Sequence, residues 1–248
     1  MQQLQRLELK IRNGSSLWPE RFPKERIRQI KQEFESIGNI NGFYQEYMNI
    51  AQSPDNAPFK PEWMKTHTWE YERIEGQPCL VQQAGEDKLV KPVEIYCGVD
   101  PASSLSARAD YFVISVIAID FEDNKYVVDF VRGKFPPSQQ PDLIVDTYKK
   151  YRPRRMKIET TGYQEALRDA TKKLMLQNKL YIPGLEKGVK PRNRKSERLF
   201  SLVPMFAKGQ FYWRPQDIEG QQEFLSYPKG KHDDIMDSIW TALDKAKP

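Results

Sequence analysis

The sequence predicts an α/β fold built on one mixed β-sheet, and three observations support this prediction. Three apolar segments, at 94–100, 111–120 and 125–134, are separated by short turns, as in an antiparallel meander. The chain then alternates helical and strand patterns, which favours parallel strands with helices covering the faces of the sheet. The longest apolar stretch, at 111–119, is too short to cross a bilayer and has the length of a central strand.

Seven further elements are expected after the meander. In chain order they are a helix at 139–151, a strand at 155–159, a helix at 163–177, a strand at 180–183, a helix at 194–208, a strand at 210–213 and a helix at 233–245. The last helix carries Ile235, Ile239 and Leu243 on one face, which predicts that it packs on the sheet.

Residues 1–90 differ from the rest of the chain. An apolar stripe predicts a helix at 24–37, a second short helix is expected at 42–49, and the pattern at 68–91 predicts a hairpin. These residues include too few apolar positions for a core of their own. We therefore expect a linker or packing arm at 1–90 and one domain at 91–248.

The composition excludes several classes of protein. Apolar residues make up 39% of the chain and charged residues 29%, which is typical of a globular protein and not of a membrane protein. The N-terminus has no apolar signal segment, and the two cysteines and two histidines are too scattered for a zinc site. We expect a cytoplasmic protein whose net charge of +5 is compatible with a nucleic-acid partner.

Six acidic residues stand at the ends of expected elements. In chain order they are Asp100, Asp110, Glu159, Asp233, Asp234 and Asp237. Each has an ordinary explanation by itself: Asp100 precedes a proline at a turn, Glu159 ends a strand at the surface, and Asp233 is suited to cap a helix.

Their joint occurrence points to a different interpretation. In a sheet of this order, the strands that end at Asp100 and Glu159 are neighbours, and the final helix would direct its aspartates at the same end. Carboxylates brought together repel one another unless a hard cation lies between them. The pattern therefore predicts a site for Mg²⁺ or Mn²⁺, with two ions able to orient a water for attack on a phosphodiester.

The motifs that carry these residues also resemble a known family. Cys97-Gly-Val-Asp-Pro-Ala102, Asp110-Tyr-Phe, Ile158-Glu-Thr160 and His232-Asp-Asp-Ile-Met-Asp237 are similar to the nuclease domain of large terminase subunits from tailed bacteriophages. Upstream, Trp18-Pro-Glu-Arg-Phe22 and Phe43-Tyr-Gln-Glu-Tyr-Met-Asn49 resemble the segment that joins the packaging ATPase to this nuclease. The resemblance implies a ribonuclease H-like fold, akin to the RuvC resolvases.

The same resemblance implies residue roles. Asp100 would be the ligand that bridges two metal ions, with Glu159 holding one ion and Asp233 the other. Accessory ligands would come from Asp234, Asp237 and Asp110. The reaction implied is cleavage of concatemeric double-stranded viral DNA during genome packaging, in the cytoplasm of an infected bacterial host.

Partners follow from the resemblance as well. They are double-stranded DNA, the packaging ATPase domain in cis or in trans, the portal protein and the small terminase subunit, with no membrane involved. The sequence has no Gly-x-x-x-x-Gly-Lys-Ser/Thr run, so the ATPase motor is expected on another part of a longer chain or on another polypeptide. Three alternatives stay open: a RuvC-like junction resolvase, a transposase-type nuclease, and a non-catalytic module that docks on the portal.

A cluster of basic residues is the natural candidate for DNA contact. It comprises Lys187, Lys190, Arg192, Arg194, Lys195 and Arg198, and His232 is a further candidate for contact with phosphate. Such cations neutralise phosphates without reading sequence, so binding should weaken steeply with salt. A solvated loop is the alternative explanation of the cluster.

Overall fold

The computed structural model describes residues 20–37, 42–43, 46–47, 57–102, 111–159, 163–185 and 195–247. Contacts divide the chain into two compact units, Met1–Pro58 and Phe59–Pro248. In the first unit, helix α2 (Lys24–Ser36) agrees with the helix expected at 24–37. The ring of Phe34 on α2 lies 6.3 Å from that of Phe43. Half of the helix expected at 42–49, namely residues 44, 45, 48 and 49, lies outside the described residues.

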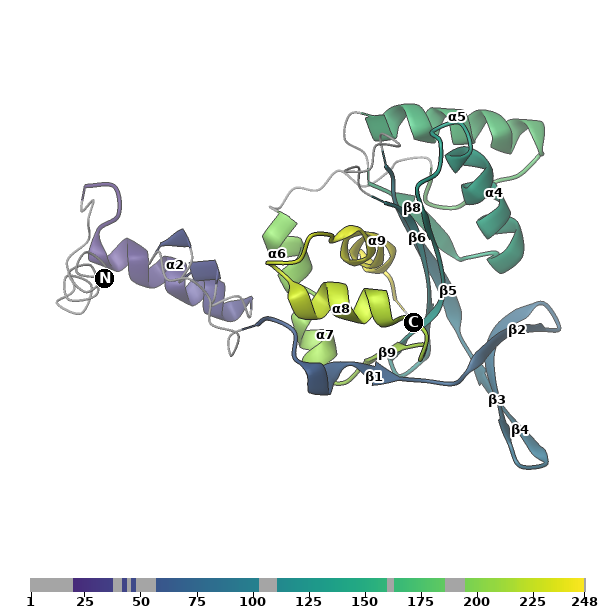
Figure 1. The fold of residues 1–248 in the computed structure, drawn as a ribbon, viewed down its shortest axis with the longest axis horizontal. Coiled ribbons are helices and arrows are strands. Elements are labelled where there is room, and N and C mark those ends of the chain that lie inside the picture. The colour runs from purple at the N-terminus through teal and green to yellow at the C-terminus, as the bar shows by residue number, and fades with distance from the viewer. Residues whose placement is uncertain are drawn as a thin grey trace. The chain divides into compact units, whose positions relative to one another are not determined.

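The second unit is built on a six-stranded mixed sheet (Figure 1). Its strands, in spatial order, are β1 (Lys65–Thr66), β9 (Phe211–Trp213), β7 (Lys125–Gly133), β6 (Phe112–Ile119), β5 (Glu94–Asp100) and β8 (Arg155–Ile158). Strands β5, β6 and β7 pair antiparallel, which confirms the expected meander. The pairs β5–β8, β7–β9 and β1–β9 are parallel.

Helices cover both faces of this sheet (Figure 1). Helices α4 (Gln140–Tyr151) and α5 (Tyr163–Gln177) lie on one face. The other face carries α6 (Lys195–Phe200), α7 (Val203–Ala207), α8 (Ile218–Ser226) and α9 (Asp234–Leu243). Each face has its own apolar core, because successive residues of β5 alternate between the two: Cys97 and Val99 pack beneath α4 and α5, whereas Tyr96 packs toward α9.

Helix α9 contacts β5 backbone to backbone. The residue of β5 that faces the helix is Gly98, and a Cβ atom built there would lie 2.0 Å from the carbonyl oxygen of Ser238 and 2.3 Å from the nitrogen of Ala242. The hydroxyls of Ser238 and Ser115 share a hydrogen bond at the same interface. Because glycine has no side chain, α9 lies directly on the centre of the sheet, and its first turn is fixed relative to the end of β5.

A smaller antiparallel sheet lies between β1 and β5 in the chain. It comprises β2 (Glu70–Ile74), β3 (Gln77–Ala84) and β4 (Asp87–Pro92), so the hairpin expected at 68–91 has a third strand. A short 3₁₀ helix, Pro61–Trp63, leads into β1. Residues 59–90 therefore belong to the same compact unit as the large sheet. A functional domain boundary at residue 91 stays a prediction.

Two expected elements are wrong, and proline explains both. Residues 180–183 form no strand: the N–H of Met156 donates to the carbonyl of Pro183 (2.8 Å), but Pro183 has no N–H with which to continue a ladder. The helix expected at 194–208 is two helices, α6 and α7, because Pro204 lies in the first turn of α7 and cannot sit inside a continuous helix. Helix α8 was not expected at all.

Candidate active site

The sheet topology brings the strand-end carboxylates to one edge. Strands β5 and β8 run parallel with Val99 opposite Ile158, so Asp100 and Glu159 follow at the same end of the sheet. Helix α9 begins at this end, with Asp233 at its N-cap position. Five of the six acidic residues singled out in the sequence are described, and Asp110 lies outside the described residues.

The charges of three other carboxylates act on Asp100. Burial raises the pKa of Asp100 well above its ordinary value, and the charges of Asp237, Asp234 and Glu159 raise it further. Burial also raises the pKa of Asp237 to about 6, although Lys195 acts in the opposite direction. The cluster is therefore a region of concentrated negative charge at the end of β5.

Two cations of α6 lie within this cluster. The Nζ atom of Lys195 is 2.9 Å from Oδ1 of Asp233 and 2.6 Å from Oδ2 of Asp237. The guanidinium of Arg198 donates to Oε2 of Glu159 at 2.8 Å, and its Nη2 lies 3.9 Å from Oδ1 of Asp237. Although burial lowers the pKa of Lys195, the carboxylates of Asp237 and Asp233 raise it more. Helix α6 thus supplies positive charge to the cluster.

The donor atoms of the cluster suit a hard divalent cation. They are all carboxylate oxygens, which Mg²⁺ and Mn²⁺ prefer. The Oδ1 atom of Asp237 is buried and accepts no hydrogen bond from any described residue. In the part of the chain that the structure describes, no group of three or more His, Cys, Asp or Glu side chains is arranged in metal-binding geometry. The cluster therefore fits a divalent ion by its chemistry, while Lys195 and Arg198 provide the counter-charge in this arrangement.

The structure also locates part of the expected DNA-binding set. Lys195 and Arg198 are paired with carboxylates, and His232 has its Nδ1 atom 3.5 Å from Oδ2 of Asp234. The other four members of the basic cluster, Lys187, Lys190, Arg192 and Arg194, lie outside the described residues. Contact of this set with DNA stays a prediction.

A buried glutamate that the sequence interpretation missed supports the first turn of α9. Although Asp233 is the N-cap residue, its side chain makes no capping bond. Instead Glu223 of α8 accepts a hydrogen bond from the N–H of Met236 at 2.9 Å. Burial raises the pKa of Glu223 to about 8, with a further contribution from Asp234. No sequence signal marks Glu223, because a glutamate in a short amphipathic helix usually faces solvent.

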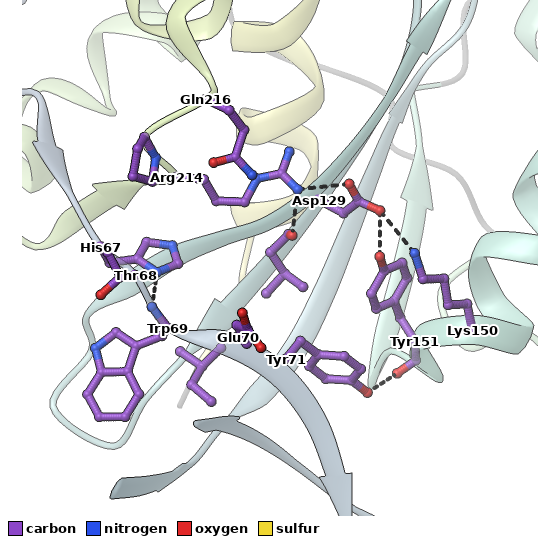
Figure 2. Close-up of a pocket in the computed structure, with 13 residues that line it drawn as sticks. His67, Thr68, Trp69, Glu70, Tyr71, Asp129, Lys150, Tyr151, Arg214 and Gln216 are labelled. Atoms are coloured by element: carbon purple, nitrogen blue, oxygen red, sulfur yellow. Dashed lines mark hydrogen bonds and ion pairs between the residues drawn. The ribbon is translucent and has the colours of Figure 1, made fainter. Parts of the chain in front are cut away.

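A separate cavity of about 530 Å³ lies beside the middle of β7 and the C-terminal end of α4 (Figure 2). Its polar side chains bond mainly to one another. The carboxylate of Asp129 accepts hydrogen bonds from Arg214 (3.0 Å) and Tyr151 (2.5 Å), and Nδ1 of His67 accepts one from the N–H of Trp69 (3.1 Å). We interpret this network as structural, because its hydrogen bonds join β7 to α4 and to Arg214. The carboxylate cluster is therefore the candidate functional site.

Comparison with known proteins gives an independent result. A protein-family model described as "Terminase RNaseH-like domain" matches residues 97–246. No curated protein matches the chain. No helix in the described part of the chain has the length and apolar character needed to span a membrane.

Solved structures share the fold. The large terminase nuclease from thermophilic phage G20c is 18% identical with a TM-score of 0.51, covering 77% of this chain and 100% of that chain. The same nuclease with bound magnesium gives 18% identity and a TM-score of 0.50, covering 80% of this chain and 100% of that chain. A longer large terminase, from another thermophilic bacteriophage, is 11% identical with a TM-score of 0.52, covering 88% of this chain and 52% of that chain.

Proposed function

The chain belongs to the terminase RNase H-like domain family, and from this premise we propose that it is a metal-dependent endonuclease that cuts concatemeric double-stranded viral DNA during genome packaging. The observation that carries the proposal is the environment of Asp100. Its carboxyl group, at the end of a central strand, has its pKa raised by burial and by three neighbouring carboxylates. Buried carboxylates this close together are costly unless cations accompany them, and perturbed pKa values of this kind are typical of functional sites.

We assign the roles of the carboxylates as follows. Asp100, Glu159 and Asp233 would hold the divalent ions, with Asp100 as the ligand that the two ions would share. Asp234, Asp237 and Asp110 are accessory ligands. When bound, Mg²⁺ or Mn²⁺ would polarise the scissile phosphate, activate the attacking water and stabilise the leaving 3′ oxygen.

The remaining residues of the site hold these carboxylates in place. Arg198 fixes the orientation of Glu159 through its hydrogen bond at 2.8 Å, while its guanidinium lies 4.7 Å from the ring centre of Trp240 on α9. Glu223 secures the first turn of α9, which carries the aspartates. Lys195 neutralises Asp233 and Asp237 in this arrangement, and a divalent ion would supply that positive charge in its place.

The longer large terminase suggests the wider context. This chain covers about half of that protein, 52% of its length. We propose that the nuclease works with a packaging ATPase, in cis or in trans, and with the portal protein and the small terminase subunit. The place of action would be the cytoplasm of an infected bacterium.

The test is cleavage of supercoiled plasmid in Mn²⁺. Asp100→Ala should abolish nicking while the folded protein still binds DNA, because the bridging ligand is lost and the fold is not. The matched control is Asp142→Ala, an exposed acid in the first turn of α4, which should nick at the wild-type rate. Nicking by Asp100→Ala at the wild-type rate would refute the site assignment.

Two further measurements separate the alternatives. A junction resolvase should strongly prefer a branched duplex over a linear one, whereas a packaging nuclease should cut both. A non-catalytic portal-docking module should gain no thermal stability from millimolar Mn²⁺, whereas a ligand set should be stabilised by mass action.

A further inference from the structure

Four residues beside the carboxylate cluster form a basic aromatic surface, which we call the ledge: Tyr111, Arg132, Lys134 and His232. The guanidinium carbon of Arg132 lies 3.7 Å from the ring centre of Tyr111, and Nζ of Lys134 lies 5.4 Å from it. The rings of Tyr111 and His232 are 5.2 Å apart at 72°. All four side chains are half-buried. Three nitrogen-bearing groups thus surround one tyrosine ring.

The ledge adjoins the active site through the register of the sheet. Asp100 on β5 is opposite Val113 on β6, and Val113 is opposite Arg132 on β7. Directly opposed residues direct their side chains to the same face, so Asp100 and Arg132 share a face about two strand spacings, or ~10 Å, apart. His232 connects the ledge to the carboxylate cluster, because its ring contacts Tyr111 and its Nδ1 atom lies 3.5 Å from Oδ2 of Asp234.

Acidic and basic residues therefore occupy different parts of this edge of the sheet. Asp100 ends β5 and Glu159 directly follows β8, whereas Arg132 and Lys134 flank Gly133, the last residue of β7. A chain of phosphates laid along the edge would meet the metal-binding carboxylates at one point and cations at the next. Within the basic cluster first expected to contact DNA, Lys195 and Arg198 are already paired with carboxylates.

We propose that the ledge binds the DNA backbone next to the bond that is cut, with Arg132, Lys134 and His232 contacting phosphate oxygens and Tyr111 holding Arg132 in place. This inference rests on the proposed nuclease function and assigns part of its substrate site. The acid paired with Arg132, Glu219, has a side chain that is 73% exposed. An ion pair with so exposed a partner is weak, so a phosphate can replace Glu219 on Arg132.

The test measures binding of the full chain to a short fluorescein-labelled duplex by anisotropy over a range of salt concentrations. It is carried out in EDTA, so that cleavage does not contribute. Lys134→Ala should weaken binding on the order of tenfold, the usual value of one hydrogen bond to a charged group. It should also reduce the slope of log K against log salt by about 0.9, the value of one lost phosphate contact.

The matched control is Lys149→Ala, which removes the same charge from the last turn of α4, at the opposite end of the sheet. Binding by this variant should equal wild type. A second variant tests the opposite sign: Glu219→Gln should tighten binding, while Glu86→Gln, in the β3–β4 turn, should not. If Lys134→Ala binds like Lys149→Ala, or if Glu219→Gln binds like Glu86→Gln, the ledge is not a DNA site.

The outcome is independent of the test of the nuclease. A protein that nicks plasmid but shows no dependence of binding on Lys134 refutes the ledge and leaves the function intact. A protein that never cleaves DNA, yet loses salt-dependent binding in Lys134→Ala, refutes the nuclease and leaves the ledge. Circular dichroism of each variant establishes that it is folded.

Discussion

The ammonium nitrogen of Lys195 lies 2.6 Å from Oδ2 of Asp237, in the middle of the proposed metal-binding cluster. The same atom also reaches Asp233 at 2.9 Å. A side chain of the protein therefore neutralises two carboxylates that we assign to divalent ions. Because both cannot hold the same oxygens at once, binding of a metal ion must compete with Lys195.

The first prediction concerns this competition. Lys195→Met retains the length of the side chain but removes its charge, so we expect Mn²⁺ to bind on the order of tenfold more tightly, the value of one charged hydrogen bond that no longer has to be broken. Isothermal titration calorimetry measures the affinity directly. Lys208→Met, an exposed lysine at the end of α7, should leave Mn²⁺ affinity unchanged. Equal or weaker binding by Lys195→Met would contradict the competition.

The second prediction concerns pH and Glu223. Burial raises its pKa from 4.5 to about 8, so between these values the folded state retains a proton that the unfolded state has lost. The free energy of unfolding must therefore fall as pH rises through this window. Glu223→Gln cannot ionise and still offers an oxygen to the N–H of Met236. We expect it to be more stable than wild type by up to ~4 kcal/mol at the alkaline end of the window, and equally stable at the acid end.

Urea unfolding in EDTA at the two ends of this window measures the effect. Glu219→Gln, on the same helix but exposed, should follow the wild-type pH dependence. The prediction is wrong if Glu223→Gln and Glu219→Gln show the same slope of stability against pH.

The sequence predicted the meander because its signals are local. Alternation and turn residues specify each strand, and β5 was expected at its observed bounds, 94–100. Two-residue β1 could not be predicted, since it pairs with β9, nearly 150 residues further along the chain, and has almost no pattern of its own. The helix at 194–208 failed for a different reason: the amphipathic pattern continues across Pro204, but the backbone cannot.

The candidate site was predictable only in part. Acidic residues at strand ends are visible in a sequence, and the parallel pairing of β5 with β8 then brings Asp100 and Glu159 together. What the sequence could not reveal is which charges pair. Lys195 lies in a basic run that was expected to contact DNA, and the run gives no sign that this lysine also pairs with the buried carboxylate of Asp237. Glu223 was invisible because its role depends on contact between two helices.

The third prediction concerns Arg198, whose partner Glu159 is almost buried: their side chains are 7% and 12% exposed. Arg198→Met keeps an unbranched side chain over Trp240 but leaves Glu159 without its cation. We expect a loss of about 3 kcal/mol in the free energy of unfolding, because breaking a buried pair strands the remaining charge. Adding Glu159→Gln should restore most of this loss, which urea unfolding of the single and double variants measures.

An exposed ion pair provides the comparison for Arg198. Nη1 of Arg154 lies 3.5 Å from Oε1 of Glu94, and the two side chains are 53% and 43% exposed. Arg154→Met should therefore lower the free energy of unfolding by less than about 1 kcal/mol. The description of the buried pair is wrong if Arg198→Met lowers the free energy of unfolding no more than Arg154→Met does. It is also wrong if the double variant is as unstable as Arg198→Met alone.

The fourth prediction tests whether direct contact between α9 and β5 positions the active site. In Gly98→Ala, the added methyl group would lie 2.0 Å from the Ser238 carbonyl oxygen and 2.3 Å from the Ala242 nitrogen. Both are backbone atoms of α9, so no side-chain rotation relieves the clash and the helix must move away. We expect the free energy of unfolding to fall by about 3 kcal/mol, at the upper end of the losses that overpacking causes. Nicking of plasmid should fall even where the variant is folded, because α9 carries Asp233, Asp234 and Asp237.

Gly133→Ala is the matched control, since the added methyl would also meet an atom at short range, 2.7 Å, but that atom belongs to the ring of Phe135. A side chain can rotate aside, so we expect a smaller loss of stability, within about 1 kcal/mol, and plasmid nicking close to wild type. Thermal unfolding and nicking of both variants separate the two cases. Wild-type nicking by Gly98→Ala would mean that the carboxylates of α9 keep their places without the close contact, and that the glycine matters for stability alone.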